Sequence, residues 1–476
     1  MKILCLLFML SIVYDYTKCA NIMAIIPSPF YSHQATFRPL WRELAKRGHK
    51  ITLMTTDPME WNENITQINN SFFHEIYEKH ELKKLMVGGH SIFEMFNKLF
   101  EASDELIKTM VTNDEFVNIL KNEKKFDLII SEIMNPMLPV LYSKLKCPFI
   151  EVYSMDAPPY LHALIGNAMH PAIYAFPIFD FQSKLFFTDR LINTLFVSVF
   201  HVSKEIIFSP FKQFVAKYTG EDFPSVFDTE KNVSLIFNSA NPVFYSMRPV
   251  TPITINIGGG LHLTDPKRLP KDLQTYLDGA KHGCIYFSFG SNVNSNFLSP
   301  EATEIFRKTF EELAPIKVLW KFENDTMPLK PKNLELKKWL PQQDVLRHPN
   351  VKVFITQGGL QSMEEAIDSA VPMLGMPFYG DQINNVKKMV EKDFGLMLDV
   401  KTMDSTSLKN SILELLNNPK YKKNIDRLSA ISKDEPMRPL EKAVWWTEYL
   451  LRHKTTEHLR VLQQTYHFIS ISFLIF

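Results

Sequence analysis

The stretch NIMAIIPSPFYSHQATFRPLWRELAKRGHKITLMTT, residues 21–56, contains two short apolar runs separated by an amphipathic segment. NIMAIIP is unbroken and apolar, as in a buried strand, and KITLMTT has the same character. Between them, FRPLWRELAKRGH places Leu40, Trp41 and Leu44 at helical spacing. A strand, a helix and a second strand within about thirty residues predict a βαβ unit, and therefore a parallel sheet.

The same alternation recurs in two blocks along the chain. Further strand patterns occur at residues 126–132, 146–154, 283–291, 317–322 and 351–356. Between the second and the third of these lies NPVFYSMRPVTPITINIGGG, residues 241–260, which combines prolines with a glycine triplet. This composition is typical of an interdomain linker, so it divides the two blocks into two domains.

The fold class predicted from this pattern is α/β, with two Rossmann-like βαβ domains that face a central cleft. We place the N-terminal domain at residues 20–257 and the C-terminal domain at residues 258–436. Residues 437–476 would then form a helix that returns to the N-terminal domain and a short apolar tail. Ligands of such folds bind beyond the carboxyl ends of the strands, which here means in the cleft.

Composition excludes one class of function. The 476 residues are 45% hydrophobic and 12% aromatic, as in a globular protein of two or three domains. The 53 basic and 52 acidic side chains give a formal charge of +1, so the concentrated basic field of a nucleic-acid-binding protein is missing. Residues 160–230 are rich in Phe, Tyr, Leu and Met with few clean periods, and we expect them to form helices and loops over a pocket.

Both ends of the chain carry apolar segments. Lys2, the apolar run 3–14 and the small or polar residues up to Cys19 form the pattern of a cleaved secretory signal, over residues 1–19. The final HFISISFLIF, residues 467–476, is about half the length of a membrane helix. It predicts either peripheral or partial membrane contact, or a sequence that lacks its natural end.

A secretory signal makes the N-glycosylation sequons meaningful. They begin at Asn64, Asn69, Asn232 and Asn324. After removal of the signal only Cys147 and Cys284 remain, which is too few for a disulfide framework, and both are expected to be buried thiols.

The segment FITQGGLQSMEEA, residues 354–366, is a strand that ends in a glycine pair where a helix begins. A helix N-terminus leaves backbone N–H groups unpaired and carries partial positive charge, so it suits phosphate oxygens. Gly358 and Gly359 permit a tight turn, and Gln361 and Ser362 offer side-chain donors. In isolation, the pattern equally fits a structural turn in which glycine is needed only for its geometry.

The surroundings of this turn favour the phosphate site. The chain reads W-x-P-Q from Trp339, then T-Q-G-G-x-Q-S-x-x-E-A, then P-x-x-G-x-P-x-x-x-D-Q up to Gln382. In this span it resembles the donor-binding signature of the UDP-glycosyltransferases, without gaps. The resemblance extends over nearly the whole chain, and PFYSHQ and GLQS look most like insect and baculoviral members. It implies the GT-B glycosyltransferase architecture of two facing Rossmann-like domains.

The resemblance also implies roles for individual residues. Trp339 would stack on uracil with Gln342 nearby, and Glu365 would bind the ribose hydroxyls. Asp381 and Gln382 would bind the hydroxyls of the sugar. The diphosphate would be held by Ser291, Gln357, Gly358, Gly359, Gln361 and Ser362. Each role suits its side chain, since a flat indole faces a base and a carboxylate accepts from a vicinal diol.

The acceptor half of the reaction needs a base. His33 follows the first strand, at the edge of the sheet that faces the cleft, and an imidazole is suited to remove a proton near neutral pH. As a lone histidine it would more often cap a helix or lie on the surface, but the resemblance implies the catalytic base. The resemblance also implies that Glu132, in FDLIISE, steadies this base, where the family more often has aspartate.

The sequence therefore predicts an inverting transfer of a hexose from a UDP-sugar to a hydroxyl of a small lipophilic acceptor. UDP-glucose is the expected co-substrate, and no other cofactor is expected. No Asp-x-Asp pair occurs, so no metal site is predicted. The expected compartment is the lumen of the endoplasmic reticulum. Two alternatives stay open: UDP-glucuronate as the donor, and a non-catalytic lipophile-binding protein on the same scaffold.

Overall fold

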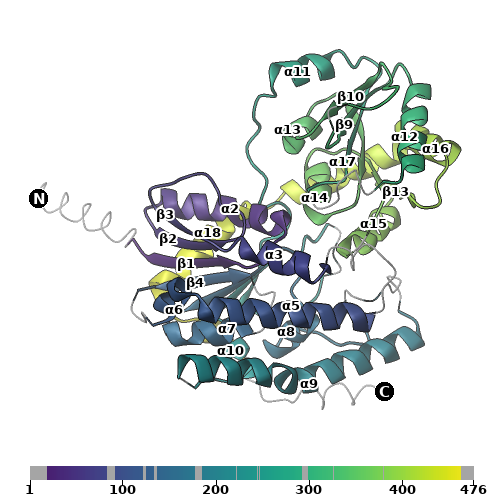
Figure 1. The fold of residues 1–476 in the computed structure, drawn as a ribbon. Helices are drawn as coiled ribbons and strands as arrows, with labels where there is room; N and C mark the ends of the chain where they lie inside the picture. Colours follow the sequence, from purple (N-terminus) through teal and green to yellow (C-terminus); the bar gives the residue numbers. More distant parts are fainter. Residues whose placement is uncertain are drawn as a thin grey trace, which may run out of the picture.

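The computed structural model contains two parallel sheets, each covered by helices (Figure 1). The residues that it describes are 19–82, 92–121, 125–132, 137–176, 179, 185–220, 222–243, 245, 247–291, 298–324, 326–378 and 380–461. Most of the predicted signal segment and the apolar tail from residue 467 lie outside these residues. Among the helices of the described part, none is both long enough and apolar enough to cross a membrane.

The first sheet has seven strands in the order β3-β2-β1-β4-β5-β6-β7. All neighbouring pairs are parallel. The strands are β1 (Asn21–Ile26), β2 (Lys50–Thr55), β3 (Ile65–Asn69), β4 (Leu128–Glu132), β5 (Phe149–Tyr153), β6 (Leu235–Asn238) and β7 (Thr254–Asn256). The predicted βαβ unit is confirmed, with β1 beside β2. The stretch 241–260 differs from a plain linker, because its segment TIN forms the edge strand β7.

The helices of this half include α2, which carries the predicted base. Their bounds are α2 (Tyr31–Lys46), α3 (Phe72–Lys79), α5 (Ile92–Thr112), α6 (Asp114–Leu120), α7 (Met137–Tyr142), the 3-10 turn η1 (Ser143–Leu145), α8 (Pro159–Leu164), α9 (Phe187–Thr219) and α10 (Val226–Lys231). The apolar spacing predicts a helix from Phe37, but α2 begins six residues earlier and runs through Pro39. His33 therefore lies in the first turn of a helix.

Residues 160–230 include α8, α9 and α10, as expected. No described residue of this region is among those that line the cavity between the two sheets. Several of its aromatic side chains pack against one another: Tyr160, Phe176 and Phe196 all have ring centroids within 6.3 Å of Phe200. Part of this aromatic-rich composition thus forms a cluster around Phe200.

The second sheet has six parallel strands in the order β10-β9-β8-β11-β12-β13. The strands are β8 (Cys284–Ser288), β9 (Lys317–Lys321), β10 (Leu334–Lys337), β11 (Val351–Thr356), β12 (Met373–Gly375) and β13 (Gly395–Met397). The helices are α11 (Lys271–Asp278), α12 (Pro300–Glu312), α13 (Gln342–Leu346), α14 (Leu360–Asp368), α15 (Asp381–Glu391), α16 (Ser405–Asn417) and α17 (Pro419–Lys433). Two separate apolar clusters form around this sheet, as expected for strands that are buried on both faces.

The last long helix, α18 (Pro439–His453), leaves the second domain and lies beside α2 of the first (Figure 1). Ala443, Val444 and Leu450 of α18 belong to the apolar core of the first sheet. Beyond it lies the 3-10 turn η3 (Glu457–Leu459). The C-terminal segment thus joins the two domains a second time, in addition to the linker.

The four sequons differ in accessibility. Asn69, Asn232 and Asn324 are exposed, whereas Asn64 is half-buried and its amide donates to the carbonyl of Ala45 at 3.2 Å. Cys147 and Cys284 are free thiols, and burial raises the pKa of each to about 12.

Candidate active site between the two sheets

A cavity of about 660 Å³ lies between the carboxyl ends of the two sheets. The first domain contributes Phe30, Tyr31, His33, Ser154 and Met155, among others. The second domain contributes Lys321 at the end of β9 and the segments that follow β8, β10, β11 and β12, so that five neighbouring strands of one sheet open onto one space. The cleft predicted from the two βαβ blocks is therefore present.

His33 is held by groups at the ends of three adjacent strands. It follows β1, while Glu132 ends β4 and Ser154 follows β5. The Nδ1 atom of His33 is 2.8 Å from Glu132 Oε1 and 2.9 Å from Ser154 Oγ, and the backbone N–H of Ser154 donates to Glu132 Oε1 at 3.2 Å. A carboxylate at Nδ1 requires a proton on that nitrogen, which leaves Nε2 as the basic atom.

This arrangement also sets the protonation of His33. Burial lowers the pKa of His33, but the charge and hydrogen bond of Glu132 outweigh burial, and the pKa is raised above its ordinary value. His33 is only 9% exposed and Glu132 only 1%, so water screens their interaction little. The pair is therefore suited to take up a proton and to hold it during a reaction.

Trp339 offers a flat apolar surface at the other end of the cavity. It lies between β10 and α13, is 64% exposed, and forms a T-shaped pair with Tyr31 of the opposite domain, with ring centroids 6.2 Å apart. An indole that lines a cavity and remains largely exposed can accept a planar ring on its face.

The glycine turn after β11 begins α14, as predicted. Gly358 has a φ of +84°, and a Cβ added to it would lie 2.3 Å from Val386, so only glycine fits. Gln357 is buried, and its amide nitrogen would lie 2.4 Å from a Cβ on Gly290. The turn thus brings a neutral amide, Gly359 and the N-terminus of α14 to the cavity wall, which is the composition of an anion site, whereas the predicted Gly358 is buried behind it and does not line the cavity.

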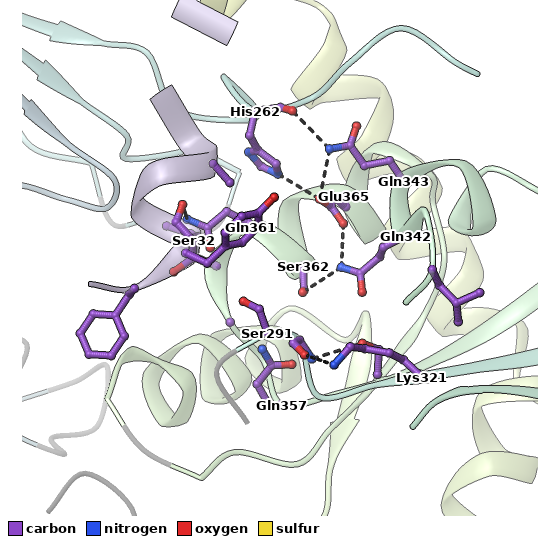
Figure 2. A pocket seen from close by; sticks show the side chains of 18 of the residues that line it. Ser32, His262, Ser291, Lys321, Gln342, Gln343, Gln357, Gln361, Ser362 and Glu365 are labelled. Carbon is purple, nitrogen blue, oxygen red and sulfur yellow. Dashed lines mark hydrogen bonds and ion pairs between the residues drawn. The ribbon is translucent and has the colours of Figure 1, made fainter. Parts of the chain in front are cut away.

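The side chains at the start of α14 point in two directions (Figure 2). Gln361 crosses the cleft, where its amide donates to Thr36 Oγ1 of α2 at 2.9 Å. Ser362 stays within the second domain and accepts from Gln342 at 3.0 Å. In this structure, Gln361 therefore joins the two domains, and Ser362 contacts Gln342 within the second domain.

Glu365 is the centre of a hydrogen-bonded group (Figure 2). Gln342 donates to its Oε2 at 2.7 Å and Gln343 donates to its Oε1 at 3.2 Å. Gln342 in turn accepts from the hydroxyl of Tyr286 at 3.0 Å. Amide donors on both oxygens fix the plane of the carboxylate, which suits a group that must accept from two adjacent hydroxyls.

Asp381 and Gln382 begin α15 after Gly380, whose φ is +63°. Asp381 accepts from Asn385 at 2.6 Å, and the oxygen of the Gln382 amide accepts from the backbone N–H of Phe378 at 2.9 Å. Burial raises the pKa of Asp381. The charge of Asp381 contributes to the raised pKa of His33, so Asp381 lies close to His33 across the cavity.

Ser291 lies at the cavity wall and is exposed, and residues 292–297, which follow it, lie outside the described residues. Near it, Lys321 at the end of β9 donates to the carbonyl of Gly290 and to Glu323, both at 2.9 Å (Figure 2). Among the described residues, no group of three or more His, Cys, Asp or Glu side chains is placed to hold a metal ion.

The structure adds lining residues that the sequence does not predict, among them Ser154, Gln343, His262 and Lys321. Ser154 follows a strand that the sequence does predict, so its place at a carboxyl end is a signal that finds it. Gln343 neighbours the predicted Gln342. Lys321 lies at the carboxyl end of a predicted strand, so the same signal finds it. His262 has no such signal, because it reaches the site from the linker, far from the signature motif.

The comparisons with known sequences agree over nearly the whole chain. A family model described as UDP-glucoronosyl and UDP-glucosyl transferase matches residues 22–475. The chain is 30% identical over 477 residues to the UDP-glycosyltransferase UGT5 of Dactylopius coccus, covering 95% of this chain and 86% of that protein. It is 31% identical over 489 residues to the ecdysteroid UDP-glucosyltransferase of Spodoptera littoralis nuclear polyhedrosis virus, covering 95% and 92%. It is 29% identical over 482–484 residues to human relatives such as UDP-glucuronosyltransferase 2B15, covering 96% and 89%.

Solved structures share the fold. The glycosyltransferase of kitacinnamycin aligns with a TM-score of 0.60 at 16% identity, over 91% of this chain and 99% of that one. Glycosyltransferase VinC, solved in complex with DTDP, aligns with a TM-score of 0.57 at 13% identity, over 91% and 99%. These neighbours confirm the predicted architecture of two facing α/β domains.

Proposed function

The chain belongs to the family of UDP-glucuronosyl and UDP-glucosyl transferases, and from this premise we propose that it transfers glucose from UDP-glucose to a hydroxyl of a small lipophilic acceptor, with inversion. Members of the family act on small acceptors, and relatives of both the glucosyl and the glucuronosyl kind match this chain. The observation that carries the proposal is that one cavity is lined both by His33, which is paired to Glu132, and by the glycine turn that precedes α14.

The proposed reaction follows from the groups around this cavity. His33 Nε2 takes the proton of the acceptor hydroxyl while Glu132 stabilises the imidazolium. The acceptor oxygen forms a bond to the anomeric carbon, and the bond from that carbon to the diphosphate oxygen breaks. Displacement from the opposite face turns an α-linked donor into a β-glycoside. UDP leaves with the electron pair, stabilised by the N-terminus of α14 and by neighbouring polar groups, without a metal ion.

Several residues support glucose as the donor and a lipophilic acceptor. Gln382 and Asp381 suit a sugar that offers only hydroxyls, and the insect and viral relatives include proteins named as glucosyltransferases. Beside His33, the first domain presents Phe30, Tyr31 and Met155 to the cavity, which favours an apolar acceptor. The proposed compartment remains the lumen of the endoplasmic reticulum, as the apolar N-terminal segment predicts.

The test is a screen for UDP release, with UDP-glucose, UDP-glucuronate and UDP-galactose, each combined with a panel of phenols and steroid alcohols. We expect UDP-glucose to give the largest kcat/KM. A larger value with UDP-glucuronate would assign the chain to the glucuronosyl branch. Binding of acceptors with no UDP release from any donor would instead favour a non-catalytic lipophile-binding protein.

Lys321 is expected to supply charge to the diphosphate, since Gln357 is neutral. Lys321→Gln should raise the KM for UDP-glucose by about tenfold and leave the acceptor KM nearly unchanged, because one charge-assisted contact to phosphate is lost. Lys352→Gln is the matched control, because Lys352 lies on β11 near its start and is exposed. An unchanged KM for UDP-glucose in Lys321→Gln would remove Lys321 from the diphosphate site.

Gln357→His should be tolerated, with a KM for UDP-glucose within about threefold of wild type. The imidazole replaces one neutral hydrogen-bonding group by another and gains positive charge as pH falls, so affinity for the diphosphate should improve towards low pH. Initial rates over a range of pH measure this. Complete loss of UDP-sugar binding would mean that the turn does not hold the diphosphate.

A further inference from the structure

His262 lies between two carboxylates beside the donor half of the cavity. It follows the glycine triplet of the linker, and its Nδ1 is 3.6 Å from Glu364 Oε2 while its Nε2 is 3.5 Å from Glu365 Oε1. All three residues are less than 9% exposed. Each ring nitrogen thus faces a carboxylate oxygen, and a neutral imidazole has only one N–H. The ring can donate towards both carboxylates only as an imidazolium.

The electrostatics of this group favour the same protonation state. Burial lowers the pKa of His262, but Glu365 and Glu364 outweigh burial, so the pKa is raised. Burial raises the pKa of Glu364 to about 7. The charged groups that face His262 are these two carboxylates of α14, while α13 contributes the neutral amide of Gln343.

The position of Glu365 is set by groups from two segments, α13 and the end of the linker. Gln342 holds Oε2 from the start of α13, and Gln343 and His262 both approach Oε1 (Figure 2). Gln343 also donates to the backbone carbonyl of His262 at 3.2 Å. Gly259 N–H donates to Glu364 at 3.3 Å, so the end of the linker is attached to α14 at two points.

We propose that His262 is a positioning residue of the donor site, which holds Glu365 in the orientation that accepts the ribose hydroxyls of the nucleotide. The inference rests on the proposed function, because it requires a ribose-bearing donor at Glu365. A protonated His262 can donate towards Oε1 of Glu365 from the linker, while Gln342 and Gln343 donate to the same carboxylate from α13, so Glu365 is held from two sides. His262 positions Glu365 only in its protonated form, and the pKa of His262 is raised. This contribution is therefore present at lower pH and is lost as pH rises through the pKa of His262.

The test compares the Kd of UDP with that of 2′-deoxy-UDP, by titration calorimetry from about pH 6 to about pH 9, where histidine titrates. In His262→Gln, we expect UDP to bind about tenfold more weakly at the low end of this range, because a charged donor to Glu365 is lost. The ratio of variant to wild-type Kd should shrink as pH rises. For 2′-deoxy-UDP the loss should be about twofold, because one of the two ribose hydroxyls is absent. His282→Gln, on the exposed turn before β8, is the control.

Equal losses for both ligands at every pH would reduce His262 to a structural role and overturn the proposal. A second variant, Glu364→Gln, covers the case in which His262→Gln does not fold. This variant removes one of the two carboxylates that raise the pKa of His262. UDP affinity should therefore begin to fall at a lower pH in Glu364→Gln than in the wild-type protein. An unmoved profile in Glu364→Gln contradicts the proposal. Failure of the wild-type protein to bind UDP at any pH would instead contradict the proposed function itself.

Discussion

Replacing His33 with alanine is expected to lower kcat by about 10²–10⁴-fold, while UDP binds as it does to the wild-type protein. The variant lacks the group that takes the proton of the acceptor, and the residues that face the nucleotide belong to the other domain. Kinetics with UDP-glucose and the best acceptor give kcat, and calorimetry with UDP gives the Kd.

Alanine also leaves Glu132 buried without its partner, which destabilises the fold. His33→Gln keeps an amide that can donate to Glu132, and should lose turnover equally. His74→Ala is the matched control, because His74 also pairs with a carboxylate, Asp57, at 3.4 Å, but does not line the cavity. Undiminished kcat in both His33 variants would remove His33 from the mechanism.

Glu132→Gln is expected to lower kcat by about 10²–10³-fold and to change its pH dependence. The amide can donate to Nδ1 and thereby favours the wrong tautomer, and it no longer stabilises the imidazolium. His33 acts as a base only when neutral, so wild-type kcat should fall as pH is lowered through a pKa above the ordinary histidine value. Without the carboxylate, burial lowers that pKa, and the acid limb should move to lower pH.

The pH dependence of kcat in both proteins measures this shift. Glu115→Gln, at an exposed position of α6, is the control for the loss of one carboxylate. Glu132→Asp keeps the charge but removes one methylene, so it tests whether the carboxylate must extend as far as Nδ1 of His33. A pH profile of Glu132→Gln that coincides with that of the wild type would show that Glu132 does not set the state of His33.

The fold was accessible from the sequence because its pattern is local. The β1–α2–β2 stretch and the restart of strands after residue 283 define two parallel sheets, and the carboxyl ends of adjacent strands bring His33 and Glu132 together. The start of α2 was not accessible, since no cap or apolar period marks Tyr31. Strand β7 was hidden among prolines, and its place is set by pairing with β6.

The site, like the fold, could be predicted from the sequence only in part. The site residues predicted between Trp339 and Gln382 could be named from the family resemblance, and all of them except Gly358 line the cavity. Contacts between distant segments could not be read from spacing. Gln361 reaches Thr36 in the other domain, and His262 reaches α14 from the linker, because tertiary packing alone brings them together. No described residue of 160–230 lines the cavity, and several aromatic residues of this region gather around Phe200, because composition does not separate a cluster from a lining.

Product analysis by proton NMR tests the central claim most directly. The protein is incubated with UDP-glucose and its best acceptor, and the coupling between H1 and H2 of the product identifies the anomer. The mechanism predicts a β-glucoside with one UDP released for each product molecule, and neither in His33→Ala. An α-glucoside, or UDP released together with free glucose and no glycoside, would contradict direct displacement by an acceptor hydroxyl activated by His33.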